Sequence, residues 1–477
     1  MLRRYILIIL LLIGGSAWGQ QTLSLQDCRN LAIQNNKKLK IADKELEASK
    51  DMKAEAFTKY LPSLDASGVY LRNQKKANLL EDDAYLPVGS FSSDGTWKPN
   101  FVMDPSTGQP AMVNGQPVIQ NFAYLPKESM SADIRNTALI QVGLTQPVYL
   151  GGKIRAYNQL AGLSEQISTS KRELELQNII QATDEAYWQV ISLVNRRMLA
   201  DKYVETLKKL ERDINLMYET GVATKSDILS VKVRLNEAEM LKLKVDDGLS
   251  LSRMLLNQIC GLSTDSIYPL EAESSMANTF VNIPKVELAK VYNQRPEITS
   301  LELATQVYKK KEKIALSEYL PEVAITANYL YHTPSFYDGL STKFDGMWSV
   351  GIGVKAPIFH WGASRKNLRQ QKAQTEIMQY RLEEAKEQIE LQVTQSEFKI
   401  KEIKKKMEMA DYNRQKSEEN LKLAELGFKE GTIPVFHVLE AQTAWLTAHS
   451  DLIDAQIEMK LCEVYLQKAY GILTTEE

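Results

Sequence analysis

The side chains that usually support catalysis or bind metals are few in this chain, and their arrangement matches neither chemistry. Its four histidines are His332, His360, His437 and His449. Neither these histidines nor the 15 methionines, which are dispersed along the chain, have the spacing of a metal site. Gly151-Gly152-Lys153 lacks the rest of a phosphate-binding P-loop. The sequence therefore predicts no enzyme activity, no cofactor and no metal site.

The three cysteines, Cys28, Cys260 and Cys462, are an odd number, which argues against a disulfide framework. Cys462 falls in a regular apolar series of a predicted helix and is best interpreted as a small buried hydrophobe. Charged residues make up 25% of the chain, and the net charge is −2. This balance argues against a nucleic-acid partner.

The second half of the chain repeats the first at a constant offset. The matching positions include Pro147 with Pro357, Gly152 with Gly362, Gly221 with Gly431, and Gly261 with Gly471. A second set, in which Tyr60-Leu61-Pro62 matches Tyr319-Leu320-Pro321, has another offset because the first copy carries an insertion before Pro147. The regularity indicates one structural unit built twice, with a period too long for a solenoid.

The N-terminus has the pattern of a secretory signal peptide. Arg3 and Arg4 precede a short apolar run and then small residues up to Gly19, so residues 1–19 are predicted to be removed and the mature chain to start at Gln20. No later apolar run reaches the length of a membrane-spanning helix. If this exported chain enters a membrane, it must do so as strands of a closed barrel, because lipid offers no partner to unpaired backbone groups.

Each copy predicts the same order: helix, strand, loop, strand, long helix, turn and return helix. In the first copy the helices are expected at about Leu25–Lys59, Lys153–Met217 and Lys225–Gln258. The long helix would measure roughly 100 Å, and its apolar residues have the spacing of a coiled-coil seam. Because the two shorter helices together nearly match its length, we expect them to stack end to end along it. The repeats are assigned to residues 20–285 and 286–477.

The strands, expected in the pairs 61–149 and 320–358, alternate apolar residues with small or polar ones. The most regular series has Trp348, Val350, Ile352 and Val354 alternating with Ser349, Gly351 and Gly353. Such alternation is typical of membrane-barrel strands, although a half-buried strand of a soluble sandwich has it too. Because the smallest single-chain barrels have about eight strands, the four strands predicted here require several protomers to share one barrel.

Two glycine-centred turns between the predicted helices complete the pattern. They read Tyr218-Glu-Thr-Gly221-Val-Ala-Thr-Lys-Ser-Asp227-Ile-Leu229 and Phe428-Lys-Glu-Gly431-Thr-Ile-Pro-Val-Phe-His437-Val-Leu439-Glu-Ala-Gln442. With these turns, the duplicated strand-to-helix layout and the Tyr-Leu-Pro segments before both strand pairs, the chain resembles the TolC-type outer-membrane efflux protein family over essentially its whole mature length.

The resemblance implies a mainly α fold with a β-barrel part. Three protomers would each give four strands to a shared 12-stranded outer-membrane barrel and their helices to an α-helical periplasmic tunnel. The implied function is the outer-membrane channel of a tripartite efflux system in a Gram-negative bacterium. It would pass drugs and toxic compounds outward from an inner-membrane transporter and a periplasmic adaptor. A type I protein-secretion conduit has the same architecture, and a non-transport periplasmic coiled-coil scaffold also remains open.

The resemblance also implies site residues. Family members meet their adaptor at the helix-turn-helix tips, which here contain Gly221, Val222, Ser226, Gly431 and Thr432. The acidic ring of the family's periplasmic aperture falls on His437 and Glu440, and Asp227 takes the acidic position after the first turn. Glu440 keeps the charge, so a trimer would present three carboxylates, whereas His437 departs from the pattern. The positions that latch the family's tips are Phe428 and Ile433 here, so that latch cannot form in the usual way.

The insertion in the first copy makes residues 72–137 much longer than their counterpart. This segment is rich in proline and glycine and contains Trp97. Outer-membrane barrels carry their long loops on the extracellular side. The sequence therefore predicts a long extracellular loop, which serves either as surface decoration or as a lid over the channel mouth.

Overall fold

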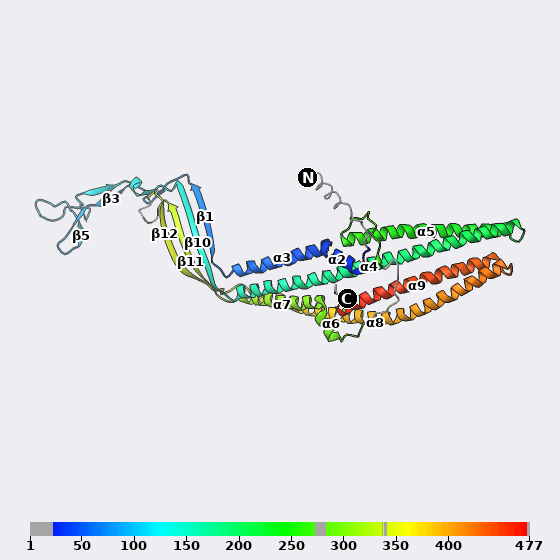
Figure 1. Ribbon diagram of the computed structural model, residues 1–477. Helices are drawn as coiled ribbons and strands as arrows, with labels where there is room; N and C mark the ends of the chain where they lie inside the picture. Colours follow the sequence, from blue (N-terminus) through cyan, green and yellow to red (C-terminus); the bar gives the residue numbers. More distant parts are fainter. Residues whose placement is uncertain (1–21, 272–282, 336, 338–340, 475–477) are drawn as a thin grey trace, which may run out of the picture. The chain divides into compact units, whose positions relative to one another are not determined.

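The computed structural model describes residues 22–271, 283–335, 337 and 341–474. The predicted signal peptide, residues 1–19, lies outside these ranges. The chain divides into two compact units, whose elements are labelled in Figure 1. The helical unit contains residues up to 56, 156–313 and those from 365 onward, and the strand unit contains residues 57–155 and 314–364.

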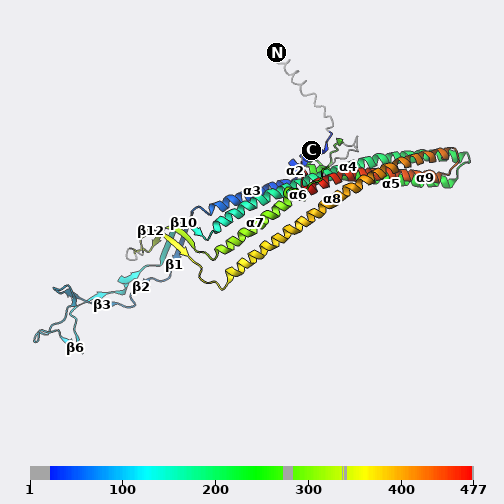
Figure 2. The ribbon, with the colours of Figure 1, turned by 90° about the horizontal axis from the view of Figure 1, so that it is seen from below.

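Two helices of equal length dominate the helical unit. They are α4 (Lys153–Glu219) and α8 (Ala363–Lys429), with 67 residues each, or about 100 Å at 1.5 Å per residue. The return helices α5 (Lys225–Cys260) and α9 (Val435–Tyr470) have 36 residues each. The two hairpins extend side by side, with their turns at the same end (Figures 1 and 2). These equal lengths confirm that the helical part is duplicated.

The prediction of one helix from Leu25 to Lys59 is wrong, because the segment forms two helices, α2 (Leu25–Asn35) and α3 (Lys37–Thr58). Asn36 between them is extended, with ψ 131°, and its side-chain oxygen accepts a hydrogen bond from the Lys38 N–H at 2.9 Å. Asparagine often competes with helical backbone bonding in this way.

The second copy breaks its helix at the corresponding residue. Here α6 (Leu288–Gln294) and α7 (Pro296–Ser317) are separated by Arg295, which is extended with ψ 116°. The cause is Pro296, since proline disfavours the helical conformation of the residue before it. Two different sequence devices therefore produce the same break.

The shorter helices stack end to end along the long helix, as their lengths predict. Along the first part of α4, Lys53 pairs with Glu165 at 2.6 Å. Along the last part, the Arg197 guanidinium lies 2.9 Å from the Asp246 carboxylate on α5. Between them, α2 and the end of α5 share a core cluster with α4 that includes the buried Tyr187. The seam of α4 is thus covered by two helices that meet at a junction.

An ion pair is buried at this junction. The Arg29 guanidinium on α2 donates to both carboxylate oxygens of Asp184 on α4, at 2.8 and 2.7 Å. Asp184 is fully buried and Arg29 is 7% exposed. Burial raises the pKa of the Asp184 carboxyl, and the guanidinium acts in the opposite direction. Because a buried carboxylate without a partner is costly, the pair holds α2 against α4.

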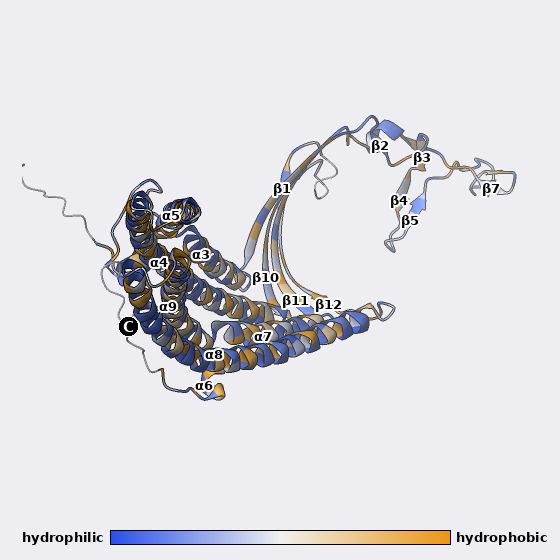
Figure 3. Cartoon of the chain, turned by 90° about the vertical axis from the view of Figure 1, so that its right-hand side faces the viewer, coloured by the Kyte–Doolittle hydropathy of each residue, from blue (hydrophilic) through white to orange (hydrophobic). Residues whose placement is uncertain are grey.

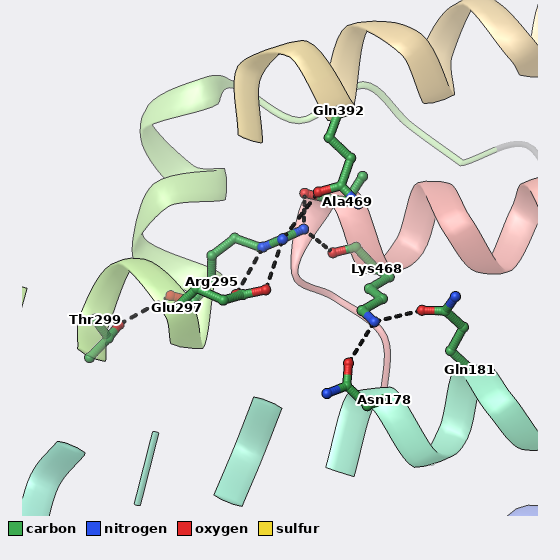
Figure 4. A network of polar contacts seen from close by, with 8 residues as sticks. All are labelled: Asn178, Gln181, Arg295, Glu297, Thr299, Gln392, Lys468 and Ala469. Carbon is green, nitrogen blue, oxygen red and sulfur yellow. Dashed lines mark hydrogen bonds and ion pairs between the residues drawn. The ribbon is translucent and has the colours of Figure 1, made fainter. Parts of the chain in front are cut away.

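The second copy has a polar network at its own junction (Figure 4). The Arg295 guanidinium donates to the backbone carbonyls of Lys468 and Ala469, at 2.8 and 3.2 Å, and so caps the C-terminal end of α9. The Lys468 ammonium in turn donates to the side-chain oxygens of Asn178 and Gln181 on α4. Burial lowers the pKa of Lys468. The network joins the end of the second repeat to the long helix of the first.

The strand unit is built on a four-stranded antiparallel sheet in the order β1-β10-β11-β12. Its strands are β1 (Ser63–Arg72), β10 (Asn136–Leu150), β11 (Glu322–Thr333) and β12 (Asp345–Lys355). Each copy therefore supplies two neighbouring strands. Within the described residues, no helix is both long and apolar enough to cross a bilayer.

The register gathers most of the apolar residues of the four strands on one face. Ile352 lies opposite Ile325, and Trp348 opposite Tyr329. Tyr329 lies opposite Val142, which in turn lies opposite Ala66. Directly opposed residues point to the same face of a sheet, and the alternation is visible along the strands in Figure 3. On β12, Trp348 is 75% and Ile352 72% exposed in the single chain.

The opposite face carries most of the small and polar residues, together with the apolar Leu139, Leu330 and Met347. Gln141 on β10 donates to Asn328 on β11 at 3.2 Å, and Asn328 lies opposite Ser349 on β12. One face of the sheet is thus mainly apolar and exposed, while the other is of mixed, more polar composition.

Between β1 and β10, the inserted segment forms short antiparallel pairs. They join β2 (Ala77–Asn78) with β9 (Ser131–Ala132), β3 (Ala84–Pro87) with β8 (Phe122–Leu125), β4 (Gly89–Phe91) with β5 (Trp97–Pro99), and β6 (Met112–Val113) with β7 (Gln116–Pro117). A short 3-10 helix, Lys127–Met130, precedes β9. The segment expected as a loop is a paired ribbon with two hairpins, because its turn-forming glycines alternate with short strands.

The buried pair at the first junction gives a stability prediction. Replacing Arg29→Ala leaves the Asp184 carboxylate buried beside a cavity, and we expect a loss of about 3–5 kcal/mol in the free energy of unfolding. Denaturant unfolding followed by circular dichroism measures it. The matched control is Lys44→Ala, which breaks an exposed pair with Glu47 and should leave stability nearly unchanged. Equal effects of the two substitutions would contradict the role given to Arg29.

Candidate functional site

The two turns at the hairpin ends have the same backbone structure. At the end of α4, the Val222 N–H donates to the Met217 carbonyl at 2.8 Å, and the Gly221 N–H donates to the Tyr218 carbonyl at 3.0 Å. Residues 432 and 431 repeat both bonds at the end of α8. This pattern is the Schellman motif, which requires a left-handed residue after the helix. Gly221 and Gly431 supply it, with φ of 79° and 68°.

The helices that follow the turns begin differently. Thr224 caps α5 in a capping box with Asp227: the Thr224 N–H and hydroxyl donate to one Asp227 carboxylate oxygen at 2.9 and 2.7 Å. α9 begins after Pro434, whose side chain makes no capping hydrogen bond. The carboxylate of Asp227 therefore has a local structural role, and its predicted place in an aperture ring remains a prediction.

The residues expected to contact an adaptor lie on the surface of the tips. Gly221, Val222, Ser226, Gly431 and Thr432 are all exposed. Added Cβ atoms at the two glycines would meet no other atom within 4 Å, so the backbone conformation and not space requires glycine there. The tips thus present a rigid backbone shape with small, accessible side chains.

His437 and Glu440 form a pair on the exposed face of α9. The His437 Nδ1 lies 3.2 Å from a Glu440 carboxylate oxygen, and the two side chains are 55% and 57% exposed. The neighbouring Val438, Leu439 and Ala441 are buried on the other face. The structure therefore brings two of the three predicted aperture residues together, one turn apart, and leaves both accessible to solvent.

The two hairpins are joined near the tips by apolar packing. Phe428 is buried in a cluster with Ile214 of α4, Val231 of α5 and Val438 of α9, and Ile433 packs against it. These two residues stand where the resemblance places the latching side chains of the family. Their apolar side chains provide no side-chain hydrogen bond for a latch, so within one chain this region is held by burial of hydrophobic surface.

The sequence interpretation missed a cleft between the hairpins. A cavity of about 480 Å³ is lined by residues of α4, α8 and α9, among them Lys202, Glu418 and Trp445. The Lys202 ammonium lies 5.2 Å from the centre of the Trp445 ring, and His449 Nε2 lies 3.0 Å from a Glu418 oxygen. The charged residues that line this cleft surround the Trp445 ring and come from three different helices. No short motif in the sequence therefore marks the cleft.

Within the part of the chain that the structure describes, no group of three or more His, Cys, Asp or Glu side chains is arranged to hold a metal ion. The polar side chains of the tips instead cap helices or face solvent.

Comparison with known proteins connects this geometry to a family. Residues 288–472 match the family model described as outer membrane efflux protein. The chain is 20% identical to the outer membrane efflux protein BepC of Brucella suis over 361 residues, 73% of this chain and 75% of that protein. It is 22% identical to the solvent efflux pump outer membrane protein SrpC of Pseudomonas putida, over 74% of this chain and 75% of that protein.

Solved structures share the fold. The outer membrane protein VceC of Vibrio cholerae has a TM-score of 0.70 at 14% identity, with 94% of this chain and 96% of that chain covered. The open state of the MtrE outer membrane channel of Neisseria gonorrhoeae has a TM-score of 0.71 at 16% identity, with 94% and 91% covered. The second half of the chain thus matches the outer membrane efflux protein family model, and the chain shares its fold with solved outer membrane channel structures.

Proposed function

We propose that this protein is the outer-membrane channel of a tripartite efflux system, through which small toxic molecules leave the cell. The observation that carries the proposal is the sheet of the strand unit, with one exposed, mainly apolar face and one more polar face. A soluble sandwich would bury the apolar face against a second sheet. In a lipid bilayer, the same face is in contact with acyl chains while the polar face lines an aqueous lumen.

The edges of the sheet support a homotrimer. β1 and β12 are its two edge strands, with 10 and 11 residues. Long edge strands with exposed apolar residues pair readily with another chain, and in lipid every edge must be closed. Pairing of β12 in one protomer with β1 in the next closes a barrel with three protomers of four strands each.

The helical unit supports the remaining partners. The exposed tips around Gly221 and Gly431 suit contact with a periplasmic adaptor. The cleft beside Trp445 has room for side chains of the adaptor. No motif for nucleotide hydrolysis occurs in the chain, so we assign the energy source to an inner-membrane transporter. His437 and Glu440 are assigned to the periplasmic aperture, where threefold symmetry would place three carboxylates around one axis.

The oligomeric state can be tested by negative-stain electron microscopy of detergent-purified protein. We expect hollow particles with threefold symmetry, because three copies are needed to close the edges of the sheet. A soluble monomer that remains in solution without detergent would contradict the channel and favour a periplasmic scaffold.

The aperture assignment can be tested with Glu440→Ala. Three carboxylates around a narrow passage attract cations, so we expect the cation-over-anion permeability ratio, measured in planar lipid bilayers, to fall toward one. The matched control is Glu408→Ala, which removes an exposed glutamate from α8 and should leave the ratio unchanged. If Glu440→Ala behaves like this control, Glu440 does not line the aperture.

Deletion of the inserted ribbon tests whether it acts as a lid. The Leu79 N–H donates to the Met130 carbonyl at 2.9 Å, so a short Gly-Ser turn can replace residues 82–127 without separating β1 from β10. The ribbon is paired within itself, and we expect its removal to leave single-channel conductance unchanged, as for surface decoration. An increase in conductance would show that the ribbon obstructs the mouth.

A further inference from the structure

Two of the three cysteines meet in the core of the first repeat. Cys28 lies on α2 and Cys260 is the last residue of α5, 232 positions later in the sequence. Both are fully buried, and they belong to the same core cluster. The Cys260 sulfur lies 3.6 Å from the backbone carbonyl oxygen of Cys28. Such proximity of residues so distant in sequence is the first requirement for a disulfide bond.

Contacts on both sides hold the two backbones together. The Asn35 side-chain amide donates to the Cys260 carbonyl at 3.1 Å, and a Cβ atom added to Gly261 would lie only 2.3 Å from that of Asn35. On the other side, Leu23 exchanges backbone hydrogen bonds with Pro269 and Glu271, at 2.9 and 3.0 Å. The cysteines therefore lie between fixed points and not in a mobile segment.

In the second repeat, the end of the return helix is held by different contacts. Its return helix α9 ends at Tyr470, which corresponds to Cys260, and the Arg295 guanidinium caps the carbonyls there. The first repeat has Asn36 at the position of Arg295, and the Asn36 side-chain oxygen accepts a hydrogen bond from the Lys38 N–H instead. The end of α5 thus has no counterpart of the Arg295 guanidinium, and Cys28 and Cys260 lie at the corresponding junction.

We propose that Cys28 and Cys260 form a disulfide bond in the mature protein. The proposal rests on the outer-membrane location that the proposed function gives to the chain, because the periplasm it crosses is an oxidising compartment where disulfides persist. The bond would tie the beginning of the mature chain to the end of the first return helix, and a cross-link that closes so long a loop constrains the unfolded chain strongly.

The oxidant is a periplasmic protein disulfide of the dithiol-oxidase class. The thiolate of one cysteine attacks a sulfur of that disulfide, and the other sulfur of the oxidant leaves as a thiolate. The second cysteine then attacks the mixed disulfide, so the oxidant leaves as a reduced dithiol and the two cysteines lose two protons and two electrons. Because both sulfurs are buried in the folded chain, this exchange precedes the docking of α2 onto α5.

Burial also explains why the third cysteine stays a thiol. Cys462 packs in a different cluster, with Ile403 and Met459, and burial raises its pKa to about 11. The hydrogen bond with the Cys260 side chain, and after it burial, raises the pKa of the Cys28 thiol. Once the chain is folded, neither thiol is an effective nucleophile, so the pairing is decided during folding by which cysteines lie together.

The number of free thiols in the outer-membrane fraction tests the proposal. Cells are quenched in acid, and the denatured protein is labelled with a maleimide polymer that shifts its mobility once per thiol. We expect one label without reductant and three after reduction. Cys462→Ala should give none and then two, and Cys28→Ser should give two in both conditions.

Three labels on the unreduced wild-type protein from this fraction would overturn the disulfide without affecting the channel. A covalent dimer that disappears on reduction would also overturn it, since it would show pairing between chains. Absence of the protein from the outer membrane would instead contradict the proposed location. As a second measurement, reduction should lower the denaturant midpoint of wild type and of Cys462→Ala, but not that of Cys28→Ser.

Discussion

The architecture of the helical unit depends on one constraint: a helix of 67 residues has an apolar seam along its whole length that must be covered. Among the helices that the structure describes, no other one in either copy is long enough to do this alone. Two shorter helices therefore share the seam and meet partway along it, and their ends bring unsatisfied backbone groups into a buried region. The buried Arg29, Asp184 and Arg295 lie at these meeting points, where polar backbone groups require partners.

The two copies meet this requirement with different chemistry. The first uses the buried pair of Arg29 and Asp184 together with the Asn35 amide on the Cys260 carbonyl. The second uses Arg295, which reaches the carbonyls of α9 and is positioned by Glu297 at 2.9 Å. The two copies thus have return helices and long helices of equal length, but different side chains at the junction. The covering helices must match the long helix in length, whereas different side chains can provide the contacts at their ends.

At the tips, too, the two copies share their backbone structure but differ in their side-chain contacts. Both turns have one hydrogen-bonding pattern with a left-handed glycine, but α5 starts with a capping box and α9 starts after a proline. Burial of Phe428 makes the packing between the hairpins apolar in this region. Phe428 and Ile433 therefore offer no side-chain hydrogen bond at the positions where the resemblance places the family's latch.

The strand unit illustrates a constraint that one chain cannot satisfy. Its register completes an apolar face over four strands, yet β1 and β12 keep unpaired outer edges. Backbone groups at such edges are costly in lipid, so the sheet is a part of a larger assembly in the function proposed here. In that function, lipid would cover the apolar side chains of β12, which are exposed in the isolated protomer.

The amino-acid sequence by itself determined the duplication, the long helices, the alternating strands and the glycine turns, because these follow from local periodicity and from residues that break helices. It also located the His437 and Glu440 pair, which are one helical turn apart. Tertiary structure alone decided what depends on contacts between distant segments. Examples are the pairing of Arg29 with Asp184, the cleft beside Trp445 and the meeting of Cys28 with Cys260. The break at Asn36 was missed at the level of sequence because asparagine is also compatible with a helix, although its side chain accepts a local hydrogen bond from the Lys38 N–H.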